Sequence, residues 1–264
     1  MADPAPQPAN VIDLFRLEGR VALVTGGSRG LGESMALGLA QAGARTVICS
    51  RDEQACAAAA ARIAAAGGVE SVPMRLDVTD EASVDAVFAS VQARFGRLDV
   101  LINSAGINLR RPLDVCPLDT FRQVLEVNLT GAWLCCRAAV RLMRPRRAGS
   151  IVNMGSALSA IGLAERTPYC SAKAGLLGLT RTVALEGAPD NVRCNAICPG
   201  PFLTEMNRPL LAEPEKVQAI VGNTALNRWA ELPEIRGAAL FLASDASSYM
   251  TGAALYVDGG WTAR

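Results

Sequence analysis

The sequence contains no histidine among its 264 residues, and this absence excludes several kinds of catalytic chemistry. A Ser-His-Asp hydrolase is ruled out, because histidine is the general base of that triad. Any general acid or base must therefore be a tyrosine, a lysine, a cysteine or a carboxylate. The eight cysteines lack the spacing of zinc ligands, so the sequence predicts no metal site. Cysteines of this kind are typical of reduced, mostly buried thiols in a cytoplasmic protein.

Two further absences limit the expected partners. The 26 basic and 25 acidic residues nearly cancel, so nothing indicates a nucleic acid or an acidic membrane surface as the partner. No apolar segment reaches membrane-spanning length without interruption by glycine, arginine or lysine. Residues 1–16 have neither the cationic start nor the apolar run of a secretory signal, and we expect a flexible tail there. The sequence thus predicts a soluble protein with a small-molecule partner.

Seven short and nearly continuous apolar runs alternate with helical patterns along the rest of the chain. Such runs are typical of parallel strands that are buried on both faces. They predict one doubly wound, Rossmann-type α/β domain over residues 17–264, with a parallel sheet of about seven strands and helices on both faces. In this fold class, ligands bind beyond the carboxyl ends of the strands. The predicted strands are residues 20–25, 45–50, 72–78, 98–106, 150–156, 192–200 and 254–260.

A glycine-rich turn follows the first predicted strand. Gly26, Gly30 and Gly32 open a helix at this point, which allows the backbone to approach a pyrophosphate and directs helix N-terminal amides at it. The spacing is G-x-x-x-G-x-G rather than G-x-G-x-x-G, and an ordinary strand-to-helix turn is the alternative. The context favours a dinucleotide-binding site.

The end of the second predicted strand indicates which dinucleotide binds. An NAD site has an acidic residue there, against the ribose hydroxyl, whereas this chain has Ser50 followed by Arg51. Arg51 favours a 2'-phosphate and hence NADP(H) over NAD(H), and Arg29 in the glycine turn can add a second cation. Either arginine could instead be a solvated surface residue.

Tyr169 and Lys173 are four residues apart in a segment with helical composition. This spacing places both side chains on one helical face, where an ammonium can lie close to a phenol. A free tyrosine ionises near pH 10, and lowering its pKa to about 7 requires roughly 4 kcal/mol of preferential stabilisation of the phenolate. A fixed cation supplies part of this, although such a pair by itself also occurs by chance on solvated helices.

The chain resembles the short-chain dehydrogenase/reductase family in its one-domain form, from about residue 17 to 262. The resemblance rests on ordered motifs, namely TGGSRGLG at 25–32, LDV at 76–78, NSAG at 103–106, VNLTG at 127–131, the serine of NMGS, Y-x-x-x-K, and PGPFLT at 199–204. Ser104 departs from the asparagine that many relatives have there, which should affect sheet packing more than chemistry. The resemblance implies a Rossmann fold and hydride transfer between a ketone and a secondary alcohol.

The resemblance also implies roles for four catalytic residues, Asn128, Ser156, Tyr169 and Lys173. Tyr169 would donate or remove the proton with a pKa near the working pH, favoured by Lys173 and by the oxidised nicotinamide. Ser156 would polarise the carbonyl, and Asn128 would position a water that links Lys173 to solvent. Each residue has a structural alternative, such as a helix cap, a turn amide or a core aromatic residue.

The turn, the strand ends and the family motifs together give the expected cofactor contacts. In the family, Asp77 contacts the adenine, Asn103–Gly106 support the sheet and line the cofactor, and Pro199–Thr204 cover the carboxamide. The full set is Gly26, Ser28, Arg29, Gly30, Leu31, Gly32, Ser50, Arg51, Asp77, Val78, Asn103, Ala105, Gly106, Tyr169, Lys173, Pro199, Gly200 and Thr204.

The substrate is the least determined part of the prediction. We expect a substrate lid over residues 205–231, because this segment interrupts the alternation of strands and helices. Arg110 and Arg111, with Ser156, are the candidate substrate contacts. Their loop resembles that of gluconate 5-dehydrogenase-like members, and an arginine there could bind the carboxylate of a sugar acid such as 5-ketogluconate.

Several alternatives remain open. The motifs equally resemble a 3-oxoacyl-carrier-protein reductase, for which the basic run 137–149 could dock an acidic carrier, and a secondary-metabolism ketone reductase is a third reading. A non-enzymatic NADP-binding sensor or assembly subunit is the alternative from another class, and the Tyr169 and Lys173 pair argues against it. Family members associate through helices near 119–144 and 168–187, so we expect a homo-oligomer, a tetramer or a dimer.

Overall fold

The computed structural model describes residues 10–205 and 207–263. Most of the predicted tail, residues 1–9, lies outside the described residues. Within the remainder of that stretch, Val11–Phe15 form a short 3-10 helix, η1, which the sequence patterns did not indicate. The side chain of Leu17 follows it and is fully buried, so the packed part of the chain begins at this residue.

A seven-stranded parallel sheet forms the centre of the molecule, which confirms the predicted fold class. Its strand order is β3-β2-β1-β4-β5-β6-β7, and every neighbouring pair is parallel. The direction of winding reverses between β1 and β4, which is the position where ligands bind in open α/β sheets. The strands are β1 (Val21–Thr25), β2 (Arg45–Ser50), β3 (Ser71–Arg75), β4 (Val100–Asn103), β5 (Gly149–Met154), β6 (Val192–Pro199) and β7 (Ala254–Val257).

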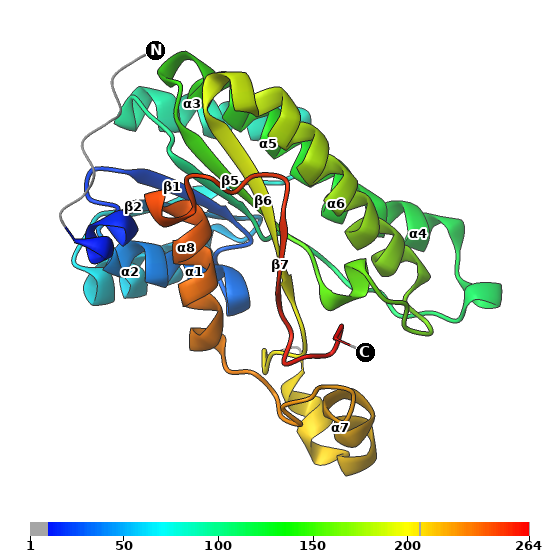
Figure 1. Cartoon of the computed structure of the whole chain (residues 1–264). Coiled ribbons are helices and arrows are strands. Elements are labelled where there is room, and N and C mark those ends of the chain that lie inside the picture. Colours follow the sequence, from blue (N-terminus) through cyan, green and yellow to red (C-terminus); the bar gives the residue numbers. More distant parts are fainter. Residues whose placement is uncertain (1–9, 206, 264) are drawn as a thin grey trace.

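Helices cover both faces of this sheet (Figure 1). One layer contains α1 (Gly30–Gln41), α2 (Glu53–Gly67) and α8 (Arg236–Ala243), which share a buried apolar cluster with the sheet. The other layer contains α3 (Glu81–Phe95), α4 (Leu118–Leu125), α5 (Gly131–Met143) and α6 (Thr167–Gly187). A second cluster of buried side chains from α3, α5 and the sheet lies beneath these helices.

Short-range chemistry determines where several helices begin and end. The Asp52 and Asp80 carboxylates accept hydrogen bonds from the backbone N–H groups of the first turns of α2 and α3. Gly68 and Gly96 end the same helices with φ of 69° and 66°, a left-handed conformation that favours glycine. Shorter helical turns are η2 (Leu113–Val115), η4 (Arg144–Arg146), η5 (Ala157–Ser159), η6 (Ala188–Asp190), η7 (Arg208–Ala212), η8 (Leu232–Ile235) and η9 (Asp245–Ser247).

The region expected to be one long helix near 119–144 is interrupted by a π-helical turn. This turn, η3 (Glu126–Thr130), joins α4 to α5 without leaving helical backbone conformation. One-turn π insertions in α-helices are often found at functional sites. The turn contains Asn128, one of the predicted catalytic residues.

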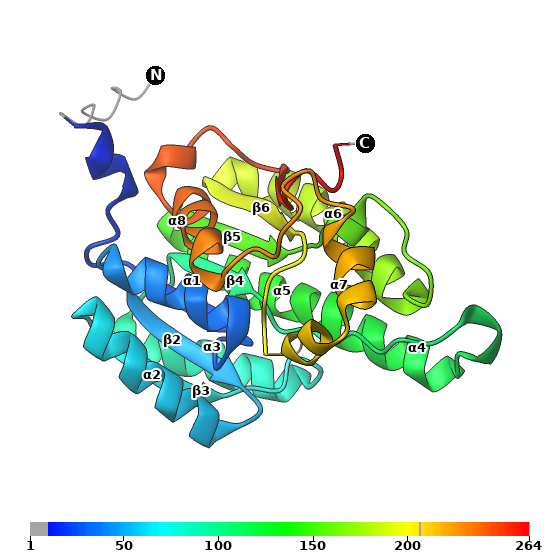
Figure 2. The ribbon, with the colours of Figure 1, turned by 90° about the horizontal axis from the view of Figure 1, so that it is seen from below.

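The predicted lid segment stands beyond the carboxyl ends of the strands. It includes η7 and α7 (Pro214–Val221), which lie below the sheet in Figure 1 and nearest the viewer in Figure 2. The segment leaves and returns at one point, because Leu203 N donates to Ala230 O at 2.8 Å and Ala230 N donates to Pro201 O at 2.9 Å. Across residues 10–205 and 207–263, no helix has the length and apolarity needed to cross a membrane.

Candidate active site

The predicted site residues converge at the carboxyl ends of β1, β4, β5 and β6. β1 and β4 lie side by side, with Thr25 aligned with Asn103 in the strand register. Thr25 Oγ1 accepts hydrogen bonds from the backbone N–H groups of Ser104 and Ala105, each at 3.1 Å. The loop after β4 is therefore held against the glycine turn after β1, and the two predicted cofactor segments meet at the switch point.

The glycine turn is packed too closely to accommodate side chains at two of its positions. Gly26 has a φ of 63°, and a Cβ there would lie 2.8 Å from the backbone of Ala105. A Cβ on Gly32 would overlap the carbonyl oxygen of Gly26. Helix α1 begins at Gly30, and the side chain of its N-cap residue Arg29 makes no capping hydrogen bond. A close-packed backbone turn with an uncapped helix N-terminus fits the pyrophosphate of a dinucleotide.

The ends of β2 and β3 place three charged side chains together. Ser50 pairs in register with Arg75, and Arg51 and Asp77 follow these strands. Burial opposes ionisation of Asp77, but hydrogen bonds from Thr79 and the charges of Arg51 and Arg75 outweigh it and lower the pKa of Asp77. Arg75 is a cation that the sequence patterns did not single out, and the β2–β3 register brings it to the same end of the sheet as Arg51, where both act on Asp77.

The side chain of Asn103 lies inside the protein, where the residue is 4% exposed. Its Nδ2 donates to Asn153 Oδ1 at 2.9 Å and to the carbonyl oxygen of Ala132 at 3.3 Å. Asn153 Nδ2 in turn donates to Thr180 Oγ1 at 2.9 Å. The structure therefore links Asn103 to the sheet and to α5, whereas Ala105 and Gly106, further along the loop, lie beside the glycine turn and the catalytic candidates.

Tyr169 and Lys173 lie on helix α6, as their spacing predicts. Lys173 is 5% exposed, and its Nζ donates to the carbonyl oxygen of Met154 at 2.5 Å. The same Nζ lies 5.6 Å from the centroid of the Tyr169 ring. Burial lowers the pKa of Lys173 to about 8, so at neutral pH most of it remains charged. This lysine is therefore a fixed buried cation beside the phenol.

The pKa of Tyr169 differs from the expectation. Burial raises it above its ordinary value, and this effect exceeds the opposing effect of a hydrogen bond with Ser156. The side chains around Tyr169 therefore do not lower its pKa towards neutral, as the sequence analysis expected. The physical reason is desolvation, which penalises the phenolate more than the neighbouring donors stabilise it.

Ser156 occupies the turn after β5 and is both a helix cap and a neighbour of Tyr169. Its Oγ accepts a hydrogen bond from Leu158 N at 3.1 Å, and Ser159 Oγ accepts one from Ser156 N at 3.1 Å. This capping box fixes the serine backbone and leaves the hydroxyl proton available for donation. The capping role considered for Ser156 is thus present together with its place beside Tyr169.

Asn128 joins the π-helical turn to the loop after β4. Its Nδ2 donates to the carbonyl oxygens of Ile107 and Val124 at 2.9 Å, and its Oδ1 accepts from Ile107 N at 3.3 Å. A Cβ on Gly106 would lie 2.5 Å from Asn128 Oδ1 and 3.8 Å from Lys173 Nζ. Asn128 and Lys173 therefore meet at Gly106.

A buried cysteine lies behind the serine turn and was not among the predicted site residues. A Cβ on Gly155 would lie 2.6 Å from Cys198 Sγ. Burial raises the pKa of Cys198 despite hydrogen bonds from Ser156 N–H and the Ser159 side chain and the nearby charge of Lys173. The thiol is therefore protonated and supports the turn that positions Ser156.

All eight cysteines are free thiols, and the described residues contain no cluster of three or more histidine, cysteine or acidic side chains suited to a metal.

The remaining predicted cofactor residues lie in the segment after β6 and in the loop after β3. A Cβ on Gly200 would lie 2.6 Å from Asp258 Cα, so the turn after Pro199 packs directly on the C-terminal segment. Thr204 N donates to Phe202 O at 2.9 Å at the start of the lid segment. Val78 packs against Gly131, where a Cβ would lie 2.7 Å from Val78 Cγ2.

The two candidate substrate arginines differ in their surroundings. The Arg111 guanidinium donates to the carbonyl oxygen of Arg110 at 2.9 Å, and Arg111 N donates to the carbonyl oxygen of Glu165 at 3.1 Å. The second bond fastens this loop to the segment that precedes Tyr169. Arg111 is thus engaged in shaping the loop, whereas the exposed Arg110 is the better candidate for a substrate contact.

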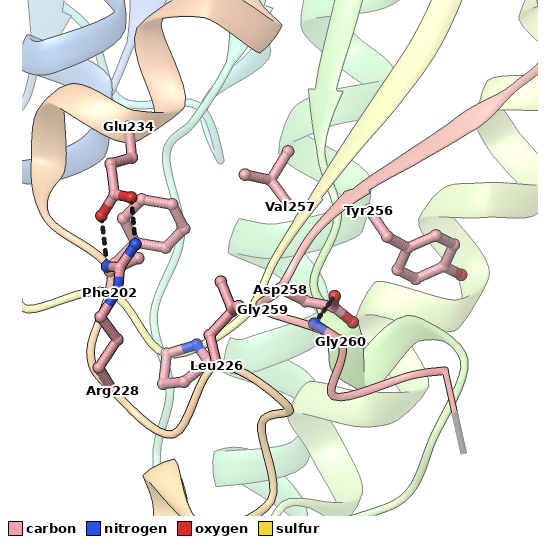
Figure 3. A pocket seen from close by; sticks show the side chains of 11 residues that line it. Phe202, Leu226, Arg228, Glu234, Tyr256, Val257, Asp258, Gly259 and Gly260 are labelled. Atoms are coloured by element: carbon pink, nitrogen blue, oxygen red, sulfur yellow. Dashed lines mark hydrogen bonds and ion pairs between the residues drawn. The ribbon is translucent and has the colours of Figure 1, made fainter.

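A separate pocket lies between the lid base and the C-terminal segment (Figure 3). Arg228 and Glu234 face each other across one side of it through two hydrogen bonds of 2.8 and 2.6 Å, and this pair lowers the pKa of Glu234 to about 2. On the other side, the Asp258 carboxylate accepts from Gly260 N at 2.9 Å. None of the four catalytic candidates lines this pocket.

Comparison with known proteins identifies the family. A family model described as "Enoyl-(Acyl carrier protein) reductase" matches residues 26–262. Gluconate 5-dehydrogenase of Gluconobacter oxydans is 36% identical over 250 residues, covering 95% of this chain and 97% of the relative. The chain belongs to the short-chain dehydrogenase/reductase family. This dehydrogenase/reductase is also 38% identical over 246 residues to a 3-oxoacyl-acyl-carrier-protein reductase of a Synechocystis strain, covering 92% of this chain and 97% of that protein.

A solved structure extends the comparison to the fold. A gluconate 5-dehydrogenase from Burkholderia cenocepacia, in complex with NADP and tartrate, superposes with a TM-score of 0.92 at 37% identity, covering 97% of this chain and 100% of that one. The dehydrogenase/reductase described here is accordingly an oxidoreductase that interconverts alcohols and ketones with a nicotinamide cofactor. Both the predicted reaction class and the predicted family are confirmed.

Proposed function

We propose that this enzyme is a cytoplasmic, NADP(H)-dependent dehydrogenase/reductase of sugar acids such as 5-ketogluconate, and that Tyr169, Lys173, Ser156 and Asn128 form its catalytic centre. The observation on which this chiefly rests is that these four residues lie at the carboxyl ends of β4 and β5, with Tyr169 hydrogen-bonded to Ser156 and Lys173 buried beside both Tyr169 and Gly106. Bound at this edge, the cofactor supplies or takes up a hydride.

The chain's own groups account for the accompanying proton transfer. The Ser156 hydroxyl donates to the carbonyl oxygen and polarises it, held by the capping box. The Tyr169 hydroxyl donates its proton to the same oxygen during reduction and recovers one during oxidation. Lys173, charged at neutral pH, favours the phenolate that results. Asn128 holds Ile107 and, in this proposal, positions a water that connects Lys173 with solvent.

The preference for NADP(H) rests on the cations at the end of β2. Arg51 and Arg75 both act on Asp77 and would hold the 2'-phosphate, and the Asp52 carboxylate is occupied in capping α2 at 2.9 Å from Ala55 N. An acidic residue free to accept from a ribose 2'-hydroxyl is the mark of NAD sites. We expect Arg51→Leu to weaken NADPH binding by about tenfold or more, because a charge-assisted contact contributes about 1.5–3 kcal/mol, and to leave NADH binding unchanged. Titration of protein fluorescence with each cofactor measures this, and equal losses for both would contradict the assignment.

The sugar-acid substrate rests on the loop after β4. The Arg111 N bond to Glu165 O places Arg110 near the segment before Tyr169, where a carboxylate could be bound while the carbonyl lies at Ser156. Relatives that include gluconate 5-dehydrogenase support this reading. A panel of 5-ketogluconate, acetoacetyl thioesters and bulky ketones, followed by NADPH absorbance, tests it. Faster turnover of a thioester or a bulky ketone would contradict it.

The carrier-protein alternative has weaker support. Arg144 and Arg147 in the basic run pair with Asp190, at 2.7 and 3.7 Å. They also precede β5, at the opposite end of the strand from Ser156. A carrier docked there would be about 20 Å of strand away from the reacting carbon. Reduction of acetoacetyl thioesters would nevertheless favour this alternative.

We also propose a homo-oligomer, a tetramer or a dimer, that associates through α5 and α6. Exposed Trp133 on α5 and Leu185 on α6, with 45% and 77% of their surfaces accessible, are suited to such a contact. Light scattering should give a mass of two or four chains, and a monomer at micromolar concentration would refute this.

A further inference from the structure

A buried arginine immediately precedes the helix on which Tyr169 lies. Arg166 is the N-cap residue of α6 and is 9% exposed. Its guanidinium remains protonated in proteins, with five N–H donors in a rigid fork. Burial of such a group is unfavourable unless acceptors or a negative charge compensate it. The surroundings of Arg166 therefore show whether the protein itself provides that compensation.

The described residues provide little compensation for the buried charge of Arg166. Within the described part of the chain, the Arg166 guanidinium has one hydrogen bond, a long one of 3.4 Å from Nη1 to the carbonyl oxygen of Glu165. The closest carboxylate oxygen is Glu165 Oε2 at 4.0 Å, and the Glu165 side chain is 57% exposed. An ion pair at this distance with a solvated partner contributes little. Nε and Nη2 of Arg166 make no hydrogen bond with the described residues, and they are not completely enclosed by protein, so a bound ligand could reach them.

A second cation, Arg110, adds to the uncompensated positive charge around Arg166. Burial lowers the pKa of Arg166, and the charge of Arg110 lowers it further. The backbone bond from Arg111 N to Glu165 O holds their two segments together. Glu165 itself has a φ of 62°, a left-handed conformation uncommon for a residue with a side chain. This turn leaves the Glu165 carboxylate in solvent while Arg166 is buried.

Arg166 lies close to the reacting group, because it is three residues before Tyr169 at the start of α6. The charge of Arg166 acts on Tyr169 and favours its phenolate, although burial of Tyr169 is the larger effect and raises its pKa. The other titratable group that faces Arg166 is Cys170, the next residue on α6. Among the described residues that act on Arg166, the one carboxylate is that of Glu165, which is largely solvated, and an anion bound near both arginines would relieve the repulsion between them.

We propose that Arg166 and Arg110 together bind the carboxylate of the substrate, so that Arg166 determines the selection of keto acids over neutral ketones. This rests on the proposed function in one respect, because it takes the carbonyl to be bound at Ser156 and Tyr169. Arg166 donates two N–H groups to the carboxylate from the buried side, and Arg110 donates from the exposed side. The substrate class is an acid whose carboxylate and carbonyl lie at opposite ends of a short polar chain.

The first test uses a matched pair of substrates. L-Sorbose is 5-ketogluconate with a CH₂OH group in place of the carboxylate, so the two differ only in the group that Arg166 would bind. We expect Arg166→Gln to raise KM for 5-ketogluconate by about 10- to 100-fold, the equivalent of a charged hydrogen bond, and to leave KM for L-sorbose nearly unchanged. Arg166→Lys should recover part of the loss. Equal changes for both substrates, or none, would overturn the inference.

A control variant removes the same charge elsewhere. Arg146 is exposed in η4, which precedes β5 and so lies at the opposite end of this strand from Ser156. Arg146→Gln should retain wild-type KM for both substrates, which shows that net charge alone is not responsible. A rise in KM for 5-ketogluconate with Arg146→Gln as large as that with Arg166→Gln would assign the effect to general electrostatic attraction and overturn the proposal.

A binding measurement separates this inference from the proposed function. Calorimetric titration of the NADP-saturated enzyme with tartrate measures carboxylate affinity without turnover, and Arg166→Gln should lose about 10-fold or more of it. If the wild type reduces neither sugar but tartrate binding depends on Arg166, the proposed substrate fails and the carboxylate site remains. If tartrate affinity is the same in wild type and folded Arg166→Gln, or is undetectable in the wild type, the site is overturned whatever the activity.

Discussion

The buried ammonium of Lys173 should make the stability of this protein depend on pH in a way that one substitution can isolate. Burial lowers the pKa of Lys173 from its ordinary value of 10.5 to about 8 in the folded protein. Between these values, the unfolded chain binds a proton that the folded protein has released. The free energy of unfolding therefore rises with pH in this interval, and the cost of the buried charge is fully present below pH 8.

The size of the effect follows from the two pKa values. Proton linkage between pH 7 and pH 9.5 gives an increase of about 2 kcal/mol in the free energy of unfolding from this one group. Other groups oppose it, since burial raises the pKa values of Cys49, Cys135 and Tyr169, and their release of protons on unfolding lowers stability as pH rises. The wild-type curve alone would therefore mix several titrations.

Lys173→Met removes the titrating group and keeps a side chain of similar length. Chemical denaturation of both proteins at one protein concentration, at several pH values from 6 to 10, gives the difference in their free energies of unfolding. We expect this difference to shift by about 2 kcal/mol in favour of the wild type between pH 7 and pH 9.5. Parallel curves over this range would refute the reasoning, because they would mean that Lys173 titrates at the same pH in both states.

Three further substitutions, and a fourth that serves as a control, test the site. Tyr169→Phe should lower turnover by about 10²- to 10⁴-fold, the usual contribution of a general acid, while NADPH binding measured by fluorescence is retained; near-normal activity would contradict the assignment. Gly106→Ala should destabilise the protein by about 1–3 kcal/mol in denaturant titrations, because its Cβ would lie 2.5 Å from Asn128 Oδ1. Gly237→Ala, a helical position with open space around it, should be neutral or stabilising by up to about 1 kcal/mol, and a loss equal to that of Gly106→Ala would show that close packing is not the cause. Cys198→Ala should retain most of kcat, since the thiol is protonated, and inactivity in a folded variant would give the cysteine a chemical role.

Much of the fold was predictable because its signals are local. Seven apolar runs correspond to the seven strands, and glycine-ended helical patterns correspond to α2 and α3. The boundaries were less accurate at the carboxyl ends, where residues 76–78, 104–106 and 155–156 were assigned to strands but form loops. Apart from Asp77 these residues are apolar or small, like strand residues, but they turn out of the sheet to form the site. The π-helical turn at Asn128 gave no periodic signal, because one extra residue in a helix alters the pattern too little to detect.

The sequence by itself determined the reaction class, because Tyr169, Lys173 and the glycine turn are defined by short spacings that a single helix or loop converts directly into geometry. Only the tertiary structure decided which charges act together. Strand register brings Arg75 and Arg51 to the same end of the sheet, and one backbone hydrogen bond from Arg111 to Glu165 joins the loops that carry Arg110 and Arg166. Burial likewise determined that Lys173 has a lowered pKa and Tyr169 a raised one. Desolvation depends on everything packed around a group, so no local pattern could have shown it.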